Sequence, residues 1–199
     1  MGDPYVTRAQ LKQHLGIKDS DASKDDLLDI ALDSASREIE NHCERQFNQV
    51  GTASARVYPV IGRDLVLVDD IYTMDGFEIR IGEVGSGFGS ALSSDLFEVR
   101  PINGVVNGVP GWAFSRIKLS CYAPYTYSTS RVEVTAKWGW QAVPAPVKEA
   151  CLLIAAKNWK LQDAPLGVAG FKDFGTAKVE NDPIAVTKLC PYTLGRGKR

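Results

Sequence analysis

Two hydrophobic periods divide the chain. Apolar residues recur every three or four positions near both ends and at every second position in the middle. A spacing of three or four places side chains on one face of a helix, whereas a spacing of two places them on one face of a strand. The pattern therefore predicts helices at the two ends and a β-rich segment between them.

Two helices are predicted in the first 51 residues. Thr7 and Gln10 have the form of a capping box, and Gly16 is typical of a helix end. Ser23 has the position of a second N-cap. The apolar positions of this second helix recur at spacings of four and three: Leu28, Leu32, Ala35, Ile39, Cys43 and Phe47. At a rise of 1.5 Å per residue, about 24 residues would span about 36 Å.

The middle of the chain predicts strands. Six runs alternate in polarity or are rich in β-branched residues: 56–60, 64–69, 77–81, 96–100, 116–121 and 131–138. The dipeptides Asp75-Gly76, Asn103-Gly104 and Asn107-Gly108 lie between runs and favour turns with positive φ. Since no helical segment separates the runs, the sequence predicts a largely antiparallel sheet or small sandwich.

Two further helices follow the strands. Pro144 and Pro146 can open a helix that continues to about Leu161. Asp182-Pro183 combines an N-cap with a proline at the first helical position and predicts a short last helix through Leu189.

The expected fold class is α+β, a small helical bundle formed by the N- and C-terminal helices with an inserted antiparallel β region. The helical core with the C-terminal loop and tail is expected from residues 1–51 and 138–199. The inserted β-rich subdomain is expected from residues 52–137.

Charge and hydropathy argue against several classes of protein. With 23 basic and 24 acidic side chains the formal charge is −1, which argues against a protein whose whole surface binds nucleic acid. No apolar run approaches the roughly 18 residues of a membrane helix. The first residues lack the pattern of a secretory signal. We therefore expect a protein that is soluble and intracellular when made.

Residues that could carry chemistry are scattered. The four cysteines (Cys43, Cys121, Cys151 and Cys190) form no close pair, which predicts reduced, mostly buried thiols rather than a zinc site. The glycine-rich segment 82–90 lacks the lysine of a phosphate loop and precedes a strand, so it predicts a flexible hairpin loop. The histidines, His14 and His42, belong to no nucleophile signature. The sequence predicts no enzyme, no cofactor and no metal.

One loop has a composition typical of neither a helical core nor an ordinary solvent-exposed loop. Residues 163–175 are too glycine-rich to form a core and too apolar for an ordinary solvent loop. A basic tail ends the sequence at 195–199. Trp138, Trp140 and Trp159 flank the third helix and predict core packing more than a binding platform.

With these pieces in place, the chain resembles the head-to-tail connector (adaptor, head completion) proteins of tailed bacteriophages. Six segments carry the resemblance: 5–12, 35–47, 134–140, 143–150, 164–175 and 189–192. The two regions that contain them, 5–47 and 134–192, make up about half of the chain, at both ends. The β region between them shows no motif that matches the family.

The resemblance implies a structural virion neck protein. Such proteins form an oligomeric ring, often a dodecamer, between the portal and the tail or stopper. The ring extends the DNA channel after packaging, so DNA passes through its lumen without specific recognition. The implied partners are other copies of the chain, the portal protein and a stopper or tail-completion protein, with no membrane. The implied location is the virion neck, after assembly in the host cytoplasm.

The resemblance also places the contacts with the portal or the neighbouring subunit in the C-terminal loop and tail. The aromatic and apolar residues would serve as anchors, and the basic residues would supply charge complementarity. The predicted contact residues are Leu166, Phe171, Phe174, Tyr192, Arg196, Lys198 and Arg199.

Alternatives remain open at this point. The chain could instead be another neck or tail-completion component, which would occupy another position in the virion but have the same non-catalytic chemistry. A virion-associated or host-side binding module would use its β insert to recognise protein or carbohydrate. An enzyme has the least support from the sequence.

Overall fold

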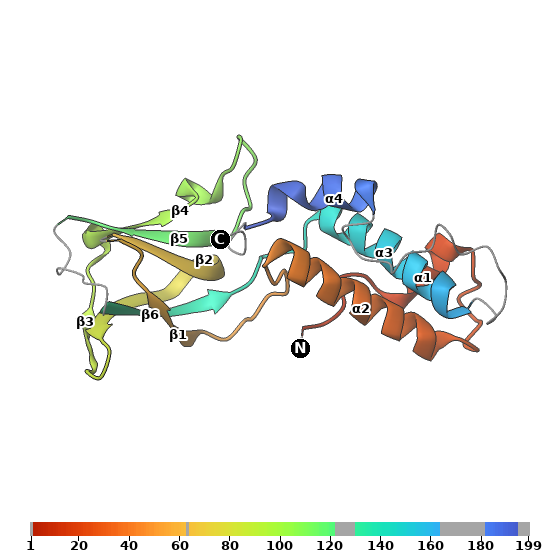
Figure 1. Cartoon of the computed structure of the whole chain (residues 1–199), viewed down its shortest axis with the longest axis horizontal. Helices are drawn as coiled ribbons and strands as arrows, with labels where there is room; N and C mark the ends of the chain where they lie inside the picture. Colours follow the sequence, from red (N-terminus) through yellow and green to blue (C-terminus); the bar gives the residue numbers. More distant parts are fainter. Residues whose placement is uncertain (1, 63, 122–129, 164–181, 195–199) are drawn as a thin grey trace. The chain divides into compact units, whose positions relative to one another are not determined.

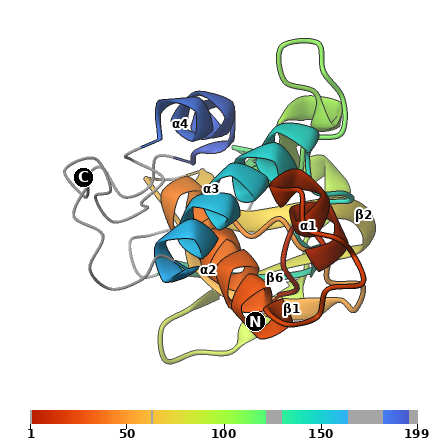
Figure 2. The ribbon, with the colours of Figure 1, turned by 90° about the vertical axis from the view of Figure 1, so that its right-hand side faces the viewer.

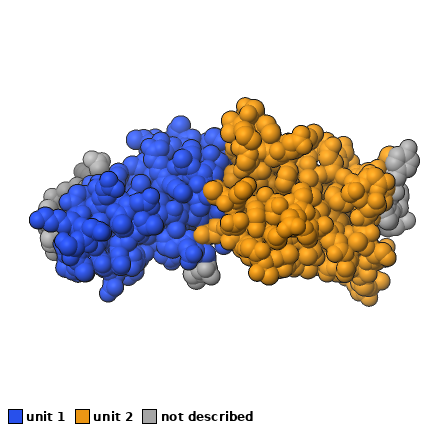
Figure 3. All heavy atoms as spheres, turned by 180° about the vertical axis from the view of Figure 1, so that it is seen from behind, with its two compact units in different colours: residues 1–47, 143–199 blue, residues 48–142 orange. Residues whose placement is uncertain are grey.

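Four α-helices and a six-stranded antiparallel sheet make up the described part of the chain (Figure 1). This computed structural model describes residues 2–62, 64–121, 130–163 and 182–194. Two helices precede the strands and two follow them, so the predicted α+β class is confirmed. The chain divides into two compact units, coloured in Figure 3. Residues 1–47 and 143–199 form the helical unit, and residues 48–142 form the sheet unit.

The first helix, α1 (Arg8–Leu15), has the ends that the sequence predicts. The Thr7 hydroxyl oxygen accepts a hydrogen bond from the Gln10 backbone N–H at 3.3 Å, and the Gln10 side-chain oxygen accepts one from the Thr7 N–H at 2.9 Å. This reciprocal pair satisfies two N–H groups that the helix itself leaves without partners. Gly16 ends α1 with a left-handed φ of 72°.

The second helix, α2 (Asp25–Cys43), is shorter than the periodicity predicts. Its N-cap is Lys24 rather than Ser23, and no side chain caps it. It ends because Glu44 adopts a left-handed φ of 54°, which turns the chain out of the helix. The prediction that Phe47 lies in this helix is therefore wrong. Phe47 is nevertheless fully buried, and its ring packs against Tyr5 and Tyr192.

The third helix, α3 (Ala145–Asp163), is central to the helical unit. The helices α1, α2 and α4 (Pro183–Leu189) all pack against it (Figure 2). As predicted, α4 begins at the Asp182 N-cap, and it continues into a 3₁₀ turn over Cys190–Tyr192. The core between the helices consists of aliphatic and small residues, mainly Leu11, Leu28, Leu32, Ala35, Ile39, Val147, Ala150, Ile154 and Leu189.

The sheet unit is one antiparallel sheet with the order β1-β6-β2-β5-β4. The short strand β3 pairs with the C-terminal part of β2. Its strands are β1 (Ser54–Pro59), β2 (Leu65–Glu83), β3 (Phe88–Ala91), β4 (Phe97–Arg100), β5 (Phe114–Leu119) and β6 (Ser130–Trp138). The buried face is formed mainly by Val66, Val68, Ile71, Ile79, Ile117, Val132, Val134 and Trp138. This alternation of buried and exposed residues is what the period of two predicts.

The strand boundaries differ from the prediction in two places. The runs 64–69 and 77–81 belong to one long strand, β2, because Asp75-Gly76 forms an irregularity within it rather than a turn between two strands. The pairing register shifts between Thr73 and Glu78, and Gly76 takes a φ of 75°. The glycine-rich segment 82–90 forms a hairpin as expected, but its second half already contains the start of β3.

Two tryptophans at the end of β6 are buried in the sheet unit, as predicted. The Trp138 indole N–H donates to the Ser54 carbonyl at 2.9 Å, and the Trp140 indole N–H donates to the Asp70 carboxylate at 2.7 Å. Gly139 lies between them with a φ of 99°. A Cβ atom at this position would lie 1.8 Å from the Asn48 carbonyl oxygen, so only glycine fits.

Candidate assembly site

The segment before α1 is held in the helical unit by one buried tyrosine. The Tyr5 backbone N–H donates to the Ser36 hydroxyl at 3.1 Å. Its own hydroxyl donates to the Glu40 carboxylate at 2.6 Å and accepts from the Phe47 backbone N–H at 3.1 Å. Burial, together with the hydrogen bond to Glu40, raises the pKa of Tyr5 well above its usual range. Tyr5 therefore stays neutral. Its hydrogen bonds join the N-terminal segment to α2, at Ser36 and Glu40, and to Phe47 after the end of α2.

The C-terminal residues of the described chain are fixed at the same place. The Phe47 ring contacts Tyr5 edge-on at a centroid distance of 5.7 Å and Tyr192 at 6.0 Å. The Leu194 backbone N–H donates to the Cys43 carbonyl at 3.0 Å. The last carbonyls of a helix lack intrahelical partners, so this bond satisfies one of them. The tail beyond Leu194 thus starts at the C-terminal end of α2.

Of the seven predicted contact residues, Tyr192 is described. Its ring is half-buried against Phe47, and burial raises its pKa. This position leaves part of the ring accessible at the root of the tail. The other six residues lie outside the described ranges: Leu166, Phe171, Phe174, Arg196, Lys198 and Arg199. The contact set stays a prediction.

The opposite end of α2 is organised by a buried lysine that the sequence did not reveal. Lys12 is 3% exposed. Its ammonium group donates to the carbonyls of Asp21 at 2.7 Å and Asp19 at 3.2 Å, and it forms an ion pair with the Asp25 carboxylate at 2.6 Å. Three acceptors match the three N–H donors of an ammonium group. Lys12 therefore fixes the connection between α1 and α2 against the start of α2.

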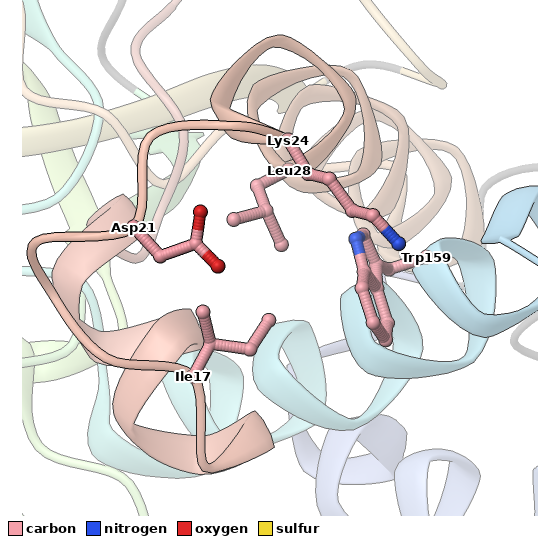
Figure 4. Close-up of a pocket in the computed structure, with 5 residues that line it drawn as sticks. All are labelled: Ile17, Asp21, Lys24, Leu28 and Trp159. Atoms are coloured by element: carbon pink, nitrogen blue, oxygen red, sulfur yellow. The ribbon is translucent and has the colours of Figure 1, made fainter.

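A pocket of about 130 Å³ lies beside this connection. It is lined by Ile17, Asp21, Lys24, Leu28 and Trp159, with the indole of Trp159 as one wall (Figure 4). The Lys24 ammonium lies 5.5 Å from the centroid of the indole, which is a cation–π distance. Hydrogen bonds from the Ser23 hydroxyl and backbone N–H lower the pKa of Asp21, so its carboxylate is charged at neutral pH.

The indole nitrogen of Trp159 is the unusual group of this pocket. It is buried and has no hydrogen-bond acceptor among the residues that the structure describes. A buried donor without a partner costs free energy. The prediction that Trp159 is a core residue is incomplete, since the ring is only partly buried and lines an open pocket.

The four cysteines are free, and none belongs to a metal-binding group of the described residues. Cys43 and Cys151 are buried, whereas Cys121 and Cys190 are exposed, so the prediction of mostly buried thiols holds for half of them. Burial raises the pKa of Cys151 to about 11, which keeps it protonated. No group of three or more histidine, cysteine or acidic residues that could hold a metal is present among the described residues. Within the same ranges, no helix has the length and apolar character needed to cross a membrane.

A family comparison bears on this part of the chain. Residues 7–67 match the family described as "Phage gp6-like head-tail connector protein". The matched range contains α1, the connection held by Lys12, α2, β1 and the first residues of β2. The resemblance to phage head-tail connectors is thereby confirmed for this range. No curated protein matches the chain significantly.

The fold of this chain is similar to that of chains in two solved structures. A chain from "Neck of empty GTA particle computed with C6 symmetry" has a TM-score of 0.55 at 17% identity, with 95% of this chain and 89% of that chain covered. A chain from "Virion of native gene transfer agent (GTA) particle" has a TM-score of 0.55 at 20% identity, with 96% and 91% covered. Both likenesses include the sheet unit as well as the helical unit.

Proposed function

We propose that this chain is a structural protein of the neck of a tailed bacteriophage or a related particle. Copies of the chain assemble as a ring between the portal and the tail or stopper, and the ring extends the DNA channel after packaging. The observation that carries this proposal is the connector match over residues 7–67. The dodecameric stoichiometry follows from the resemblance and belongs to the proposal.

The likeness of fold supports the same function for the sheet unit. The strands carry no connector motif, but the two solved chains with the same fold come from a particle neck and a virion, and each is covered over about nine tenths of its length. This support for a role of the sheet unit in the assembly is an analogy that rests on likeness of fold.

The proposed portal contact is the root and the basic end of the C-terminal tail. Tyr192 and Leu194 attach the root to Phe47 and to the end of α2. Beyond them, Arg196, Lys198 and Arg199 supply positive charge, and Leu166, Phe171 and Phe174 in the loop before α4 supply apolar anchors. DNA would pass through the lumen without sequence recognition. The protein would act in the virion neck, after assembly in the host cytoplasm, and would need no catalysis.

Electron microscopy and a binding assay with the cognate portal test this proposal. The wild-type chain should form or join rings on purified portal particles. The charge reversal R196E/K198E/R199E should weaken portal binding by about tenfold or more, because three attractive contacts become repulsive. A matched reversal of three exposed basic residues on β4 and β5, R100E/R116E/K118E, should change binding little. Wild-type protein that never joins a portal ring would overturn the proposed function.

A binding module with a recognition surface on the sheet unit is the second candidate. Seven of the exposed large apolar residues of the described chain lie on this unit: Val57, Met74, Val84, Phe88, Ile102, Val105 and Val109. If the sheet unit serves recognition, I102D/V109D would abolish attachment to the partner while the portal contact remained intact. If the chain is a neck protein alone, that variant would still assemble on the portal, and no separate partner would be lost.

A further inference from the structure

The N-terminal segment is attached to the second half of α2 through one carboxylate. The Arg37 guanidinium donates to the Gly2 carbonyl at 3.1 Å. It also pairs with one oxygen of the Glu40 carboxylate at 2.8 Å, while the other oxygen accepts the hydrogen bond from the Tyr5 hydroxyl at 2.6 Å. The carboxylate is thus held from both sides, and it fixes the position of the Tyr5 hydroxyl.

Phe47 connects this attachment to the other end of the chain. Its backbone N–H is buried and donates to the Tyr5 hydroxyl at 3.1 Å. Its ring contacts the rings of Tyr5 and Tyr192, and the side chain is fully buried. Without the Tyr5 hydroxyl, the Phe47 N–H would lose this acceptor in a buried place, which costs free energy and favours a shift of Phe47. Such a shift would move the surface on which Tyr192 packs.

The root of the tail, Tyr192–Leu194, has two kinds of support. On one side, the Thr193 hydroxyl donates to the Leu189 carbonyl at 3.4 Å, a contact with α4 that does not involve the N-terminal segment. On the other side, the Tyr192 ring packs on Phe47 and the Leu194 N–H donates to the carbonyl at the end of α2. The second support depends on the place of Phe47 and therefore on Tyr5.

A fixed root matters because the tail is short. Five residues follow Leu194, and three of them are basic. Fully extended, five residues span about 17 Å, so the direction in which the tail starts decides where its charges can reach. A binding segment that is already held in its bound direction also avoids part of the entropy cost of ordering on binding.

We propose that Tyr5 is a positioning residue for the portal contact. Its hydroxyl holds Phe47, Phe47 holds Tyr192, and the N-terminal segment in this way sets the direction in which the basic tail leaves the helical unit. The inference rests on the proposed function and deepens it, because it assigns a role in portal binding to a buried residue that acts only through the tail.

The first experiment tests the support of the root without any portal. A nitroxide label is attached at Thr193→Cys, an exposed position of the root, in a chain whose exposed thiols are removed by C121S and C190S. Y5F keeps the ring and removes only the hydroxyl. We expect Y5F to increase the mobility of this label, measured by electron paramagnetic resonance. A label at Thr187→Cys, which is exposed on α4, should keep its mobility.

The sheet unit offers a matched control. The Tyr58 hydroxyl also donates to a carboxylate, that of Asp69, at 2.8 Å, and it also accepts a backbone N–H, that of Asp69, at 3.4 Å. Y58F therefore removes a hydroxyl with the same kinds of partner at a place that does not touch the root. It should leave both labels and portal binding unchanged.

The second experiment separates positioning from a general loss of stability. Affinity for portal rings is measured for Y5F with the natural tail and with the neutral tail R196Q/K198Q/R199Q. We expect Y5F to weaken binding by about threefold or more with the natural tail, because the root must then be ordered on binding. With the neutral tail, Y5F should change binding little, because no charges remain to be placed. A merely structural role would weaken both chains by the same factor.

A second variant acts on the root itself and leaves the N-terminal segment untouched. L194P removes the N–H that donates to the Cys43 carbonyl. Thr193 has φ −74° and ψ 129°, a conformation that suits the residue before a proline, so the change is compatible with the backbone there. We expect L194P, like Y5F, to increase the mobility of the label at Thr193→Cys and to weaken portal binding.

The outcomes distinguish this inference from the proposed function. Unchanged mobility of the root label in Y5F would overturn the positioning role, and so would an equal loss of portal affinity with the natural and the neutral tail. In both cases wild-type binding to the portal still supports the function. Wild-type protein that does not bind portal rings overturns the proposed function, and the positioning role fails with it, whatever the label shows.

Discussion

At the scale of single residues, the clearest constraint is Gly139. Its φ of 99° is unfavourable for a residue with a side chain, and the Asn48 carbonyl occupies the place of a Cβ atom. We expect G139A to lower the free energy of unfolding by about 3 kcal/mol or more, because the backbone strain adds to a clash that only a shift of the main chain can relieve.

A matched glycine separates the two causes. Gly111 has a similar φ of 90°, but a Cβ atom there would meet nothing within 4 Å. G111A should therefore cost about 1 kcal/mol, the strain alone. Urea unfolding followed by tryptophan fluorescence gives both values. Equal losses for the two variants would show that the approach of Asn48 to Gly139 does not constrain the fold.

Lys12 shows what single-sequence reasoning misses at this scale. A lysine between apolar helix positions looks like a surface residue, because nothing in the local pattern marks its partners. Two of those partners are backbone carbonyls, at Asp19 and Asp21, and any residue would provide them. Sequence patterns identify a buried cation poorly for this reason: its acceptors depend on the path of the chain rather than on residue type.

At the scale of elements, local cap signals predicted the starts of α1 and α4 but not that of α2, whose N-cap is Lys24 rather than Ser23. The capping box at Thr7 and the Asp182-Pro183 start were both confirmed, because each depends on contacts within four residues. The predicted end of α2 and the predicted length of β2 were both wrong. Glu44 takes a left-handed conformation that its residue type does not favour, and the Asp75-Gly76 turn signal is overridden by pairing of β2 with β6 on both sides of it.

The attachment of α4 depends on Asp182. Burial alone would raise its pKa, but hydrogen bonds from Lys157 and from the backbone N–H groups of Ala185 and Ile184 bring the pKa below its usual value. D182A removes the cap and leaves Lys157 without its partner, so we expect a loss of about 1–2 kcal/mol at neutral pH. T187A, an exposed change on the same short helix, should cost less than about 0.5 kcal/mol.

The pH dependence of this contribution has a definite sign. A carboxylate whose pKa is lower in the folded state stabilises the fold above its unfolded pKa, about 3.9, and loses that effect as pH falls through the folded value. The difference in unfolding free energy between wild type and D182A should thus be constant from about pH 7 to pH 5 and shrink below about pH 4. A difference that persisted unchanged at lower pH would show that the carboxylate charge contributes nothing.

At the scale of the whole molecule, the sequence predicted the class and order of the elements but not the Trp159 pocket. The fold class followed from two hydrophobic periods, which average over many residues. The pocket combines Ile17, Leu28 and Trp159 from three separate segments, and only the packing of α3 on α2 brings them together. Trp159 gave a signal in the sequence as a large aromatic residue near a helix end, but core packing explained that signal equally well.

Assembly on the portal should appear as a gain in stability of this chain. A partner that binds only the folded state stabilises it by RT ln(1 + [L]/Kd), about 2.7 kcal/mol at a hundredfold excess over Kd. The thermal midpoint of the chain should therefore rise when portal rings are added, and less so at high salt, because contacts of the basic tail are screened. R196E/K198E/R199E should show a smaller rise that high salt does not reduce, because salt screens the repulsive contacts of the reversed tail as well. A wild-type midpoint that portal rings leave unchanged, under conditions where the portal itself is intact, would mean that the neck ring does not form through this chain.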